Sequence, residues 1–214
     1  MSKKGKNWIK GQLRDNYYRK SKKEGYRSRA AYKLLQIDSK YKIFKVNGKF
    51  PKKILDLGAA PGAWLEVIIK KYQDIPIQRR NPNFKVIGID LTTIHPFQNA
   101  PFIETYRMDI FNEKCEKEII SKEKPFDVIL SDLAPKTTGD FRDIAKQEAM
   151  VEKVFEFTKF LRRHGNIVVK IFQSENTNEI MRNWKPKFQI LKRMKPPASR
   201  ESSREIYIIG VNFH

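Results

Sequence analysis

The 214-residue sequence contains one cysteine, Cys115, and only three histidines. A single cysteine excludes an internal disulfide and fits a reducing compartment, and so few scattered ligands give no spacing typical of a metal site. No stretch reaches the roughly 18 apolar residues that a membrane span needs, and no apolar secretion signal lies near the start. We therefore expect an intracellular protein, in the mitochondrial matrix or the cytoplasm, that is not secreted and uses neither a membrane nor a metal.

Acidic residues are scarce, with 24 Asp and Glu against 44 Lys and Arg, for a net charge of +20. Residues 1–53 hold 18 of these cations and only 3 acids, which places +15 of the charge there. A solvated tail or a targeting segment would explain the charge alone, but aromatic residues are interleaved with the cations: Trp8, Tyr17, Tyr18, Tyr26, Tyr32 and Tyr41. Cations mixed with rings are typical of nucleic-acid surfaces, so we expect a polyanionic partner.

Hydrophobic residues make up 40% of the chain, which suits one domain with a real core. The pattern from 12 to 42 predicts helix with a break at Gly25, and places Lys33 on an apolar-striped helix. We divide the chain into a basic N-terminal extension, 1–45, and a sheet-containing part, 46–214, within a single domain.

Short apolar segments alternate with helical ones along the rest of the chain. We predict strands at 53–57, 84–90, 101–106, 126–131, 166–172, 187–194 and 205–211, and helices at 63–72, 113–123, 141–163 and 176–184. This order predicts an α/β fold, a Rossmann-like, mostly parallel sheet with helices on both faces. No helix separates the last two strands, so the last strand should be antiparallel.

The first predicted strand ends in a glycine turn, Asp56-Leu57-Gly58-Ala59-Ala60-Pro61-Gly62-Ala63-Trp64. Ligands of open α/β sheets bind beyond the carboxyl ends of the strands. Gly58 and Gly62 permit a sharp turn and a close backbone approach, and the amides of the next helix could meet a carboxylate. The turn lacks the G-x-G-x-x-G pattern of dinucleotide sites, which argues with the charge against a dehydrogenase.

Three aspartates follow successive strands at the same edge of the predicted sheet. Asp90 is placed to accept hydrogen bonds from ribose hydroxyls, Asp109 to meet an adenine amino group, and Asp132 follows the fourth strand. Any one of them alone is more simply a turn or cap residue. Together behind a glycine turn they indicate an adenosine-containing cofactor.

Five segments in order resemble the FtsJ/RlmE family of S-adenosylmethionine-dependent RNA ribose 2′-O-methyltransferases, from about Trp8 to the C-terminus. They are Tyr26 to Leu34, Asp56 to Trp64, Ser131-Asp132-Leu133-Ala134-Pro135, Val168-Val169-Lys170-Ile171-Phe172, and Lys195 through Tyr207. Ala63, where bacterial members often carry glycine, and a longer, more basic 73–84 loop depart from the family pattern.

The resemblance implies a seven-stranded class I methyltransferase fold with S-adenosylmethionine as cofactor and S-adenosylhomocysteine as product. The expected cofactor-binding residues lie in the glycine turn and at the strand ends: Asp56, Gly58, Pro61, Gly62, Ala63, Trp64, Asp90, Asp109 and Asp132.

Lys33, Asp132, Lys170 and Glu205 form the expected catalytic set. A ribose 2′-hydroxyl must lose its proton as it attacks, and a lysine can accept it only if burial or a neighbouring cation lowers the lysine pKa. Lys170 ends an apolar strand, so we predict that it is the general base. Lys33 would supply the neighbouring charge, and Asp132 and Glu205 would orient the amines. The simpler alternative is four ordinary surface charges or structural ion pairs.

Phosphate contacts are expected from basic residues of the extension and of the loop before Glu205: Arg14, Arg19, Lys20, Lys22, Lys23, Arg27, Arg29, Arg200 and Arg204. Arg27 and Arg29 could equally pair within the fold. The segments Gln12 to Asp15 and Thr138 to Asp143 resemble ribosomal members of the family, so the favoured substrate is a uridine of large-subunit ribosomal RNA, with the large subunit as partner of a monomeric enzyme. The alternatives are a tRNA anticodon-loop methyltransferase and a ribosome assembly factor that binds RNA without chemistry.

Overall fold

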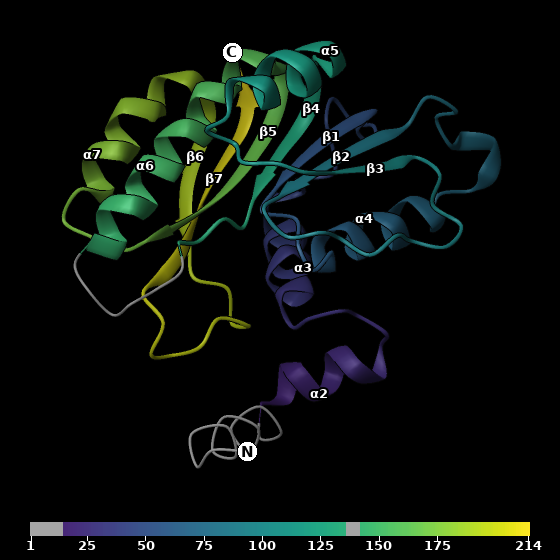
Figure 1. Ribbon diagram of the computed structural model, residues 1–214, viewed down its shortest axis with the longest axis horizontal. Coiled ribbons are helices and arrows are strands. Elements are labelled where there is room, and N and C mark those ends of the chain that lie inside the picture. The colour runs from purple at the N-terminus through teal and green to yellow at the C-terminus, as the bar shows by residue number, and fades with distance from the viewer. Residues whose placement is uncertain (1–14, 136–141) are drawn as a thin grey trace.

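A computed structural model describes residues 15–135 and 142–214 (Figure 1). The helices are α2 (Asn16–Lys23), α3 (Ala30–Tyr41), α4 (Ala63–Gln73), α5 (Ser121–Glu123), α6 (Arg142–Glu156) and α7 (Thr177–Trp184). The strands are β1 (Lys53–Leu57), β2 (Lys85–Asp90), β3 (Ile103–Arg107), β4 (Phe126–Ser131), β5 (Leu161–Phe172), β6 (Phe188–Met194) and β7 (Glu205–Phe213). Short 3₁₀ turns occupy Ile77–Arg79, Phe157–Phe160 and Lys185–Lys187, and a π-helical turn, Cys115–Ile120, precedes α5.

The strands form one seven-stranded sheet in the order β3-β2-β1-β4-β5-β7-β6. Strands β1 to β5 pair in parallel, whereas β7 runs antiparallel to both of its neighbours. The predicted sheet, with its antiparallel last strand, is confirmed. Because the chain order reverses between β1 and β4, their carboxyl ends form the kind of switch point where α/β proteins bind ligands.

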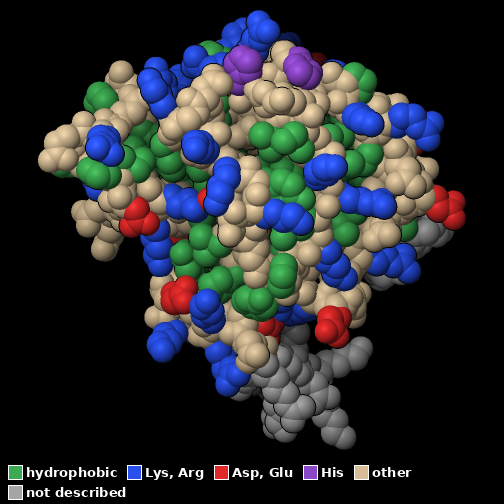
Figure 2. All heavy atoms as spheres, turned by 180° about the vertical axis from the view of Figure 1, so that it is seen from behind, with side chains coloured by type: hydrophobic (Ala, Val, Ile, Leu, Met, Phe, Trp, Pro, Cys, Tyr) green, Lys and Arg blue, Asp and Glu red, His purple; other side chains and the backbone are tan. Residues whose placement is uncertain are grey.

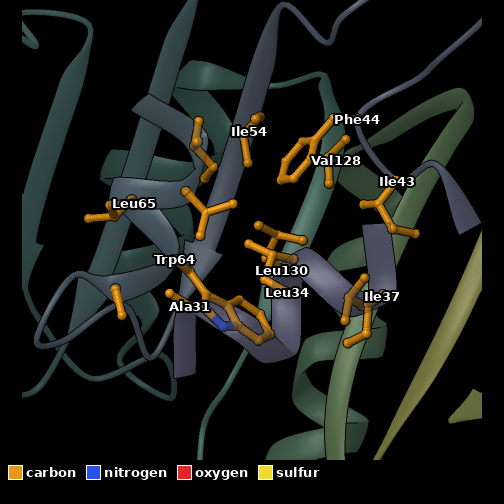
Figure 3. Close-up of a cluster of buried hydrophobic side chains, with 14 of the residues drawn as sticks. Ala31, Leu34, Ile37, Ile43, Phe44, Ile54, Trp64, Leu65, Val128 and Leu130 are labelled. Atoms are coloured by element: carbon orange, nitrogen blue, oxygen red, sulfur yellow. The ribbon is translucent and has the colours of Figure 1, made fainter. Parts of the chain in front are cut away.

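Both faces of the sheet are buried. Alternate residues of each central strand point to opposite faces. Ile54 and Val128 belong to a first core cluster that includes residues of α3 and α4, and Leu55 and Ile129 belong to a second that includes residues of α6 and α7. Figure 3 shows the first cluster, in which Trp64 lies against α3. Near-continuous apolar strands are what a sheet covered by helices on both sides requires.

Helix α3 is part of the core. Leu34 and Ile37 are fully buried, and the indole nitrogen of Trp64 donates a hydrogen bond to the Ala30 carbonyl over 2.9 Å. The buried Asn166 amide of β5 donates to the Ile43 carbonyl, which lies just beyond α3. The division at residue 45 therefore marks a change in composition, while residues 30–45 pack as part of the sheet-containing domain.

The predicted break at Gly25 is confirmed: over the described part of 12–42, a connector at 24–29 separates α2 from α3, and Gly25 adopts a φ of 72°. A later boundary differs from the prediction. The predicted helix 141–163 is wrong at its end, because α6 stops at Glu156 and β5 already begins at Leu161. Leu161 pairs with Phe126 of β4, so sheet pairing prevails over an apolar spacing that also fits a helix. None of the described helices has the length and apolar character needed to cross a membrane.

Candidate active site

The glycine turn lies at the switch point, beyond the carboxyl end of β1. Gly58 has a φ of 77°, and a Cβ there would lie 2.9 Å from the backbone nitrogen of Leu133. Gly62 has a φ of 107°, and a Cβ there would lie 2.6 Å from the ring of Phe97. Larger residues at either position would meet both backbone strain and a steric clash. The turn is thus held close to the loops that follow β2 and β4.

Arg27, from the connector between α2 and α3, fastens these loops together. Its guanidinium donates to the carbonyls of Pro61, His95 and Pro96 over 2.8–3.0 Å and lies 3.8 Å from the centroid of the Phe97 ring. Its backbone amide also donates to Glu66 of α4. The geometry therefore favours the alternative in which Arg27 pairs within the fold, because its guanidinium links the glycine turn to the loop after β2.

Asp56 is a buried carboxyl in β1 that lacks any hydrogen-bond partner among the described residues. Burial, together with the negative charges of Asp132 and Asp90, raises its pKa well above the ordinary value. A buried acceptor without a donor lowers the stability of the fold. The position of the Asp56 carboxyl behind the glycine turn fits a ligand that carries positive charge or donor groups, such as the amino and sulfonium groups of S-adenosylmethionine.

Asp90 and Asp109 stand at the ends of neighbouring strands, β2 and β3, as predicted. The Asp90 carboxylate accepts from the amide of Ala60 over 3.0 Å and from that of Thr92 over 2.7 Å. Asp109 accepts from the amide of Phe111 over 3.0 Å. Both carboxylates therefore order their own turns, and each retains lone pairs that could also meet ribose or adenine donors.

The predicted catalytic set forms two ion pairs. The Lys170 ammonium lies 3.1 Å from Asp132 Oδ1 and donates to the Asp132 carbonyl over 2.5 Å. The Lys33 ammonium lies 2.5 Å from Glu205 Oε1. Both lysines are buried, with exposures of 9% for Lys33 and 7% for Lys170. Residues from α3, β5, β7 and the end of β4 are thus brought together.

Tyr207 joins the two pairs and was not predicted as a site residue. Its hydroxyl donates to Asp132 Oδ1 over 2.7 Å, and the Lys33 ammonium lies 5.9 Å from its ring centroid. Burial and the charges of Asp132 and Glu205 raise the Tyr207 pKa well above its ordinary value, which keeps the hydroxyl a donor. Its position two residues after Glu205 was the available signal, because alternate residues of a strand share a face.

Opposing effects act on the Asp132 carboxyl. Burial alone would raise its pKa, but the positive charges of Lys170 and Lys33 and hydrogen bonds from Tyr207 and Lys170 outweigh it and lower the pKa. Asp132 is therefore an anion that orients Lys170.

Gln147 of α6 is a second residue that the sequence did not reveal. Its buried amide donates to the carbonyls of Leu133 and Lys170 over 3.1 and 2.9 Å. It thereby fixes the ends of β4 and β5, which carry Asp132 and Lys170. A glutamine within a helix has no spacing that predicts this contact.

A pocket of about 350 Å³ opens beside Lys33 and Glu205, lined also by Arg29, Arg200 and Ser203. Burial and the nearby charge of Arg200 lower the pKa of Arg29, which Glu205 partly offsets. Arg29 also pairs with Asp15 and donates to the carbonyl of Ala198. It therefore combines internal contacts with a position at the pocket.

The remaining predicted phosphate contacts lie on the surface. Arg19, Lys20, Lys22 and Lys23 are exposed on α2, and Arg200 and Arg204 are exposed in the loop before β7. Arg14 and most of the segment 138–143 lie outside the described residues. Lys and Arg are scattered over the whole face seen in Figure 2, where Asp and Glu are few.

Comparison with known proteins identifies the family. The model of the FtsJ-like methyltransferases matches residues 26–213. The chain belongs to this family. It is 40% identical over 209 residues to a ribosomal RNA large subunit methyltransferase E of Rickettsia akari and 39% identical to that of Rickettsia bellii, and each alignment covers 96% of this chain and 88% of the relative.

A solved structure gives the same result for the fold. The crystal structure of a putative ribosomal RNA methyltransferase from Plasmodium falciparum matches with a TM-score of 0.70 and 30% identity, over 88% of this chain and 98% of that one. The resemblance seen in the sequence and the methyltransferase fold are both confirmed, and the protein is a methyltransferase.

Proposed function

We propose that the protein methylates a ribose 2′-hydroxyl of large-subunit ribosomal RNA, using S-adenosylmethionine. The observation that carries the proposal is the ion pair of buried Lys170 with half-buried Asp132, which Tyr207 links to Lys33 and Glu205. Close to it lies the carboxyl of Asp56, which has no hydrogen-bond partner among the described residues. The names of the relatives, which are ribosomal RNA methyltransferases, support the choice of RNA.

The glycine turn and its strand ends would hold the cofactor, which supplies a methyl group already activated on a sulfonium. Asp56 would face its cationic part, Gly58, Pro61, Gly62, Ala63 and Trp64 would give it backbone room, and Asp90 and Asp109 would meet its adenosine. The first turn of α4 adds amides suited to a carboxylate, because Gly62 caps this helix without a side-chain hydrogen bond.

Lys170 would meet the ribose hydroxyl. The 2′-oxygen would bond to the methyl carbon while the bond from that carbon to the sulfonium sulfur breaks, which leaves S-adenosylhomocysteine. The hydroxyl proton would pass to Lys170 as a neutral amine, which Asp132 would hold in place. The Lys33–Glu205 pair borders the pocket next to the same residues, where it can position the nucleotide. Positioning supplies much of the rate, because the methyl donor needs no further activation.

The extension would bring the RNA to this site. The cations of α2, with Arg200 and Arg204, are exposed and would contact phosphates, because the methylated ribose carries no base identity to read. We propose that residues 1–45 act as the RNA-binding part of the single domain and that the protein acts as a monomer.

The test is a methylation map made with the purified protein, labelled S-adenosylmethionine, large ribosomal subunits, naked ribosomal RNA and tRNA. We expect label on a ribose 2′-oxygen, at a uridine of the large-subunit RNA. Label confined to a tRNA anticodon loop would mean that the substrate is tRNA. RNA binding without any methyl transfer would indicate a ribosome assembly factor.

A further inference from the structure

A second pocket, of about 780 Å³, lies at the opposite end of the sheet from the glycine turn. It adjoins the residues that lead into the amino end of β1 and the end of α4. Aromatic side chains line it: Phe44 and Tyr72 are buried, and Phe50 is half-buried between them, with ring centroids 5.9 and 6.0 Å away. Its volume falls within the range of about 300–1,000 Å³ that is typical of ligand sites.

Four cations also line this pocket, which we call the basic pocket: Lys45, Lys49, Lys52 and Arg79. No aspartate or glutamate is among its described lining residues. Within residues 15–135 and 142–214, none of the four side chains forms an ion pair or a hydrogen bond. Their charge is thus uncompensated by neighbouring carboxylates.

Two lysines close to the basic pocket, Lys53 and Lys71, are paired. Lys53, the next residue along the chain, lies 3.2 Å from a Glu123 carboxylate oxygen, and Lys71 of α4 lies 2.5 Å from Asp38. Carboxylates are therefore present around this end of the molecule, yet they pair with lysines outside the basic pocket. The four lining cations are exposed and have no such partner among the described residues, so they are available to an anion from outside the chain.

Both walls of the basic pocket are held in place. A tight turn at 46–49 forms one wall, with Asn47 and Gly48 at φ values of 48° and 78°, as in two-residue hairpin turns. The other wall is the basic 73–84 loop, where the Tyr72 hydroxyl donates to the Asn81 carbonyl over 2.8 Å. The pocket is consequently preformed and needs little ordering on binding.

We propose that the basic pocket binds an unpaired stretch of the RNA substrate, with a base against Phe50 and phosphates on the four cations. Sites for single-stranded nucleic acid combine a cationic groove with rings on which bases stack, and this pocket has both. An acidic protein segment would use the cations but not the aromatic lining. The inference rests on the proposed function, since it takes the occupant to be the same RNA whose ribose is methylated.

Helix α3 connects this pocket to the catalytic site. Lys33 lies in its first turns, and Phe44 follows shortly after its end at Tyr41. From Lys33 to Tyr41 the helix advances eight residues, a rise of about 12 Å. At about 3.4 Å for each nucleotide of a stacked strand, that rise corresponds to about three to four nucleotides. The RNA in the basic pocket should therefore be several nucleotides away from the methylated one.

A charge-removal variant tests the proposal. Lys45, Lys49 and Arg79 are replaced together by alanine, and the affinity for a large-subunit RNA fragment is measured across salt concentrations. We expect about a tenfold loss of affinity, and a slope of log affinity against log salt that falls by about 2 to 3, for three lost phosphate contacts. KM for RNA should rise while kcat and the affinity for S-adenosylmethionine stay unchanged.

The matched control removes three exposed lysines from the other side of the sheet, Lys114, Lys122 and Lys146. It loses the same charge, so it reports the general effect of net charge. A loss of affinity as large as that of the pocket variant would overturn the proposal, because the effect would then not belong to the pocket.

Phe50→Leu tests stacking separately, since leucine keeps an apolar side chain but has no ring face. We expect about a fivefold loss of RNA affinity with an unchanged salt slope, and a thermal unfolding profile close to that of the parent. Photo-crosslinking with bromouridine-substituted RNA should label peptides that contain residues 44–52 in the parent protein and should lose this label in Phe50→Leu.

The outcomes separate this inference from the proposed function. Unchanged affinities and crosslinks that avoid 44–52 would overturn the pocket assignment even if the protein methylates ribosomal RNA normally. If the charge-removal variant bound naked RNA as the parent does but bound the large subunit more weakly, the occupant would be a ribosomal protein. That result would also overturn the pocket assignment. Pocket crosslinks without any methyl transfer would support the pocket and refute the proposed activity.

Discussion

Cations at the end of the sheet that carries the glycine turn and cations around the basic pocket differ in what they contact. Lys170, Lys33 and Arg27 are each bound to carboxylates or carbonyls of the protein. Among the described residues, Lys45 and Arg79 have no such partner. Paired cations are fixed in position, which suits chemistry on one atom, whereas unpaired ones keep their charge for an external anion.

We expect the largest effect on methyl transfer from replacing Lys170, the paired cation that we propose as the general base. Lys170→Ala would leave the Asp132 carboxylate without its nearest cation, at a cost of about 3–5 kcal/mol, so loss of activity could reflect unfolding. Lys170→Arg is sharper, because arginine preserves the charge but cannot accept a proton. We expect methyl transfer to fall by about 10²–10⁴-fold.

Single-turnover rates with saturating RNA measure this effect, and calorimetry with S-adenosylmethionine checks that the cofactor site is intact. Lys192→Arg, at an exposed position on β6, is the matched control and should keep the parent rate. A Lys170→Arg protein that methylates RNA at the parent rate would remove Lys170 from the role of base.

Asp56 provides a test with an acidic residue. Its carboxyl lies next to the glycine turn and has no hydrogen-bond partner among the described residues. Its raised pKa means that the folded protein holds a proton which the unfolded chain releases above about pH 3.9. The stability due to this proton is complete below that pH and is lost as the pH rises through the folded pKa. The free energy of unfolding should fall by about 1.4 kcal/mol for each pH unit in that window.

Asp56→Asn removes this pH-dependent contribution to the free energy of unfolding, so the stability of the variant relative to the parent should improve with rising pH. Denaturant unfolding at several pH values between 4 and 9 measures the difference. Asp132 acts in the opposite sense, because its lowered pKa makes its contribution disappear as the pH falls, but it is common to both proteins and cancels. A pH-independent difference would show that Asp56 is ionised in the folded protein. The variant should also bind S-adenosylmethionine more weakly.

Arg27 is a paired cation whose role is positional. Arg27→Ala frees the carbonyls of Pro61 and His95, so the glycine turn and the loop after β2 lose their common donor. We expect about a tenfold weaker affinity for S-adenosylmethionine, or about 1.4 kcal/mol, in titration calorimetry. The salt slope of RNA binding should not change, and a decrease of that slope by about one would instead mean that Arg27 contacts phosphate.

Patterns within short segments predicted most of the fold, and they also singled out the four residues that form the ion pairs Lys33–Glu205 and Lys170–Asp132. The apolar strands, the glycine turn and the position of Lys170 at the end of a strand are properties of short segments, and they predicted the sheet and its functional edge. The contacts of Arg27 and Gln147 depend on which loops and helices meet in space, which no spacing reveals. The start of β5 at Leu161 was missed for the same reason, since its pairing with Phe126 is distant in sequence.

The smallest effect should come from the exposed cations of α2. Replacing Lys22 and Lys23 by alanine removes two side chains that lie at the surface in the last turn of this helix. We expect a loss of RNA affinity of about three- to fivefold and a salt slope lower by about 1.4 to 1.8. Stability should change by less than about 0.5 kcal/mol, as is usual for surface substitutions. Because neither lysine contacts the glycine turn, unchanged cofactor affinity would distinguish this pair from Arg27, and a flat response of RNA binding would exclude α2 from the RNA surface.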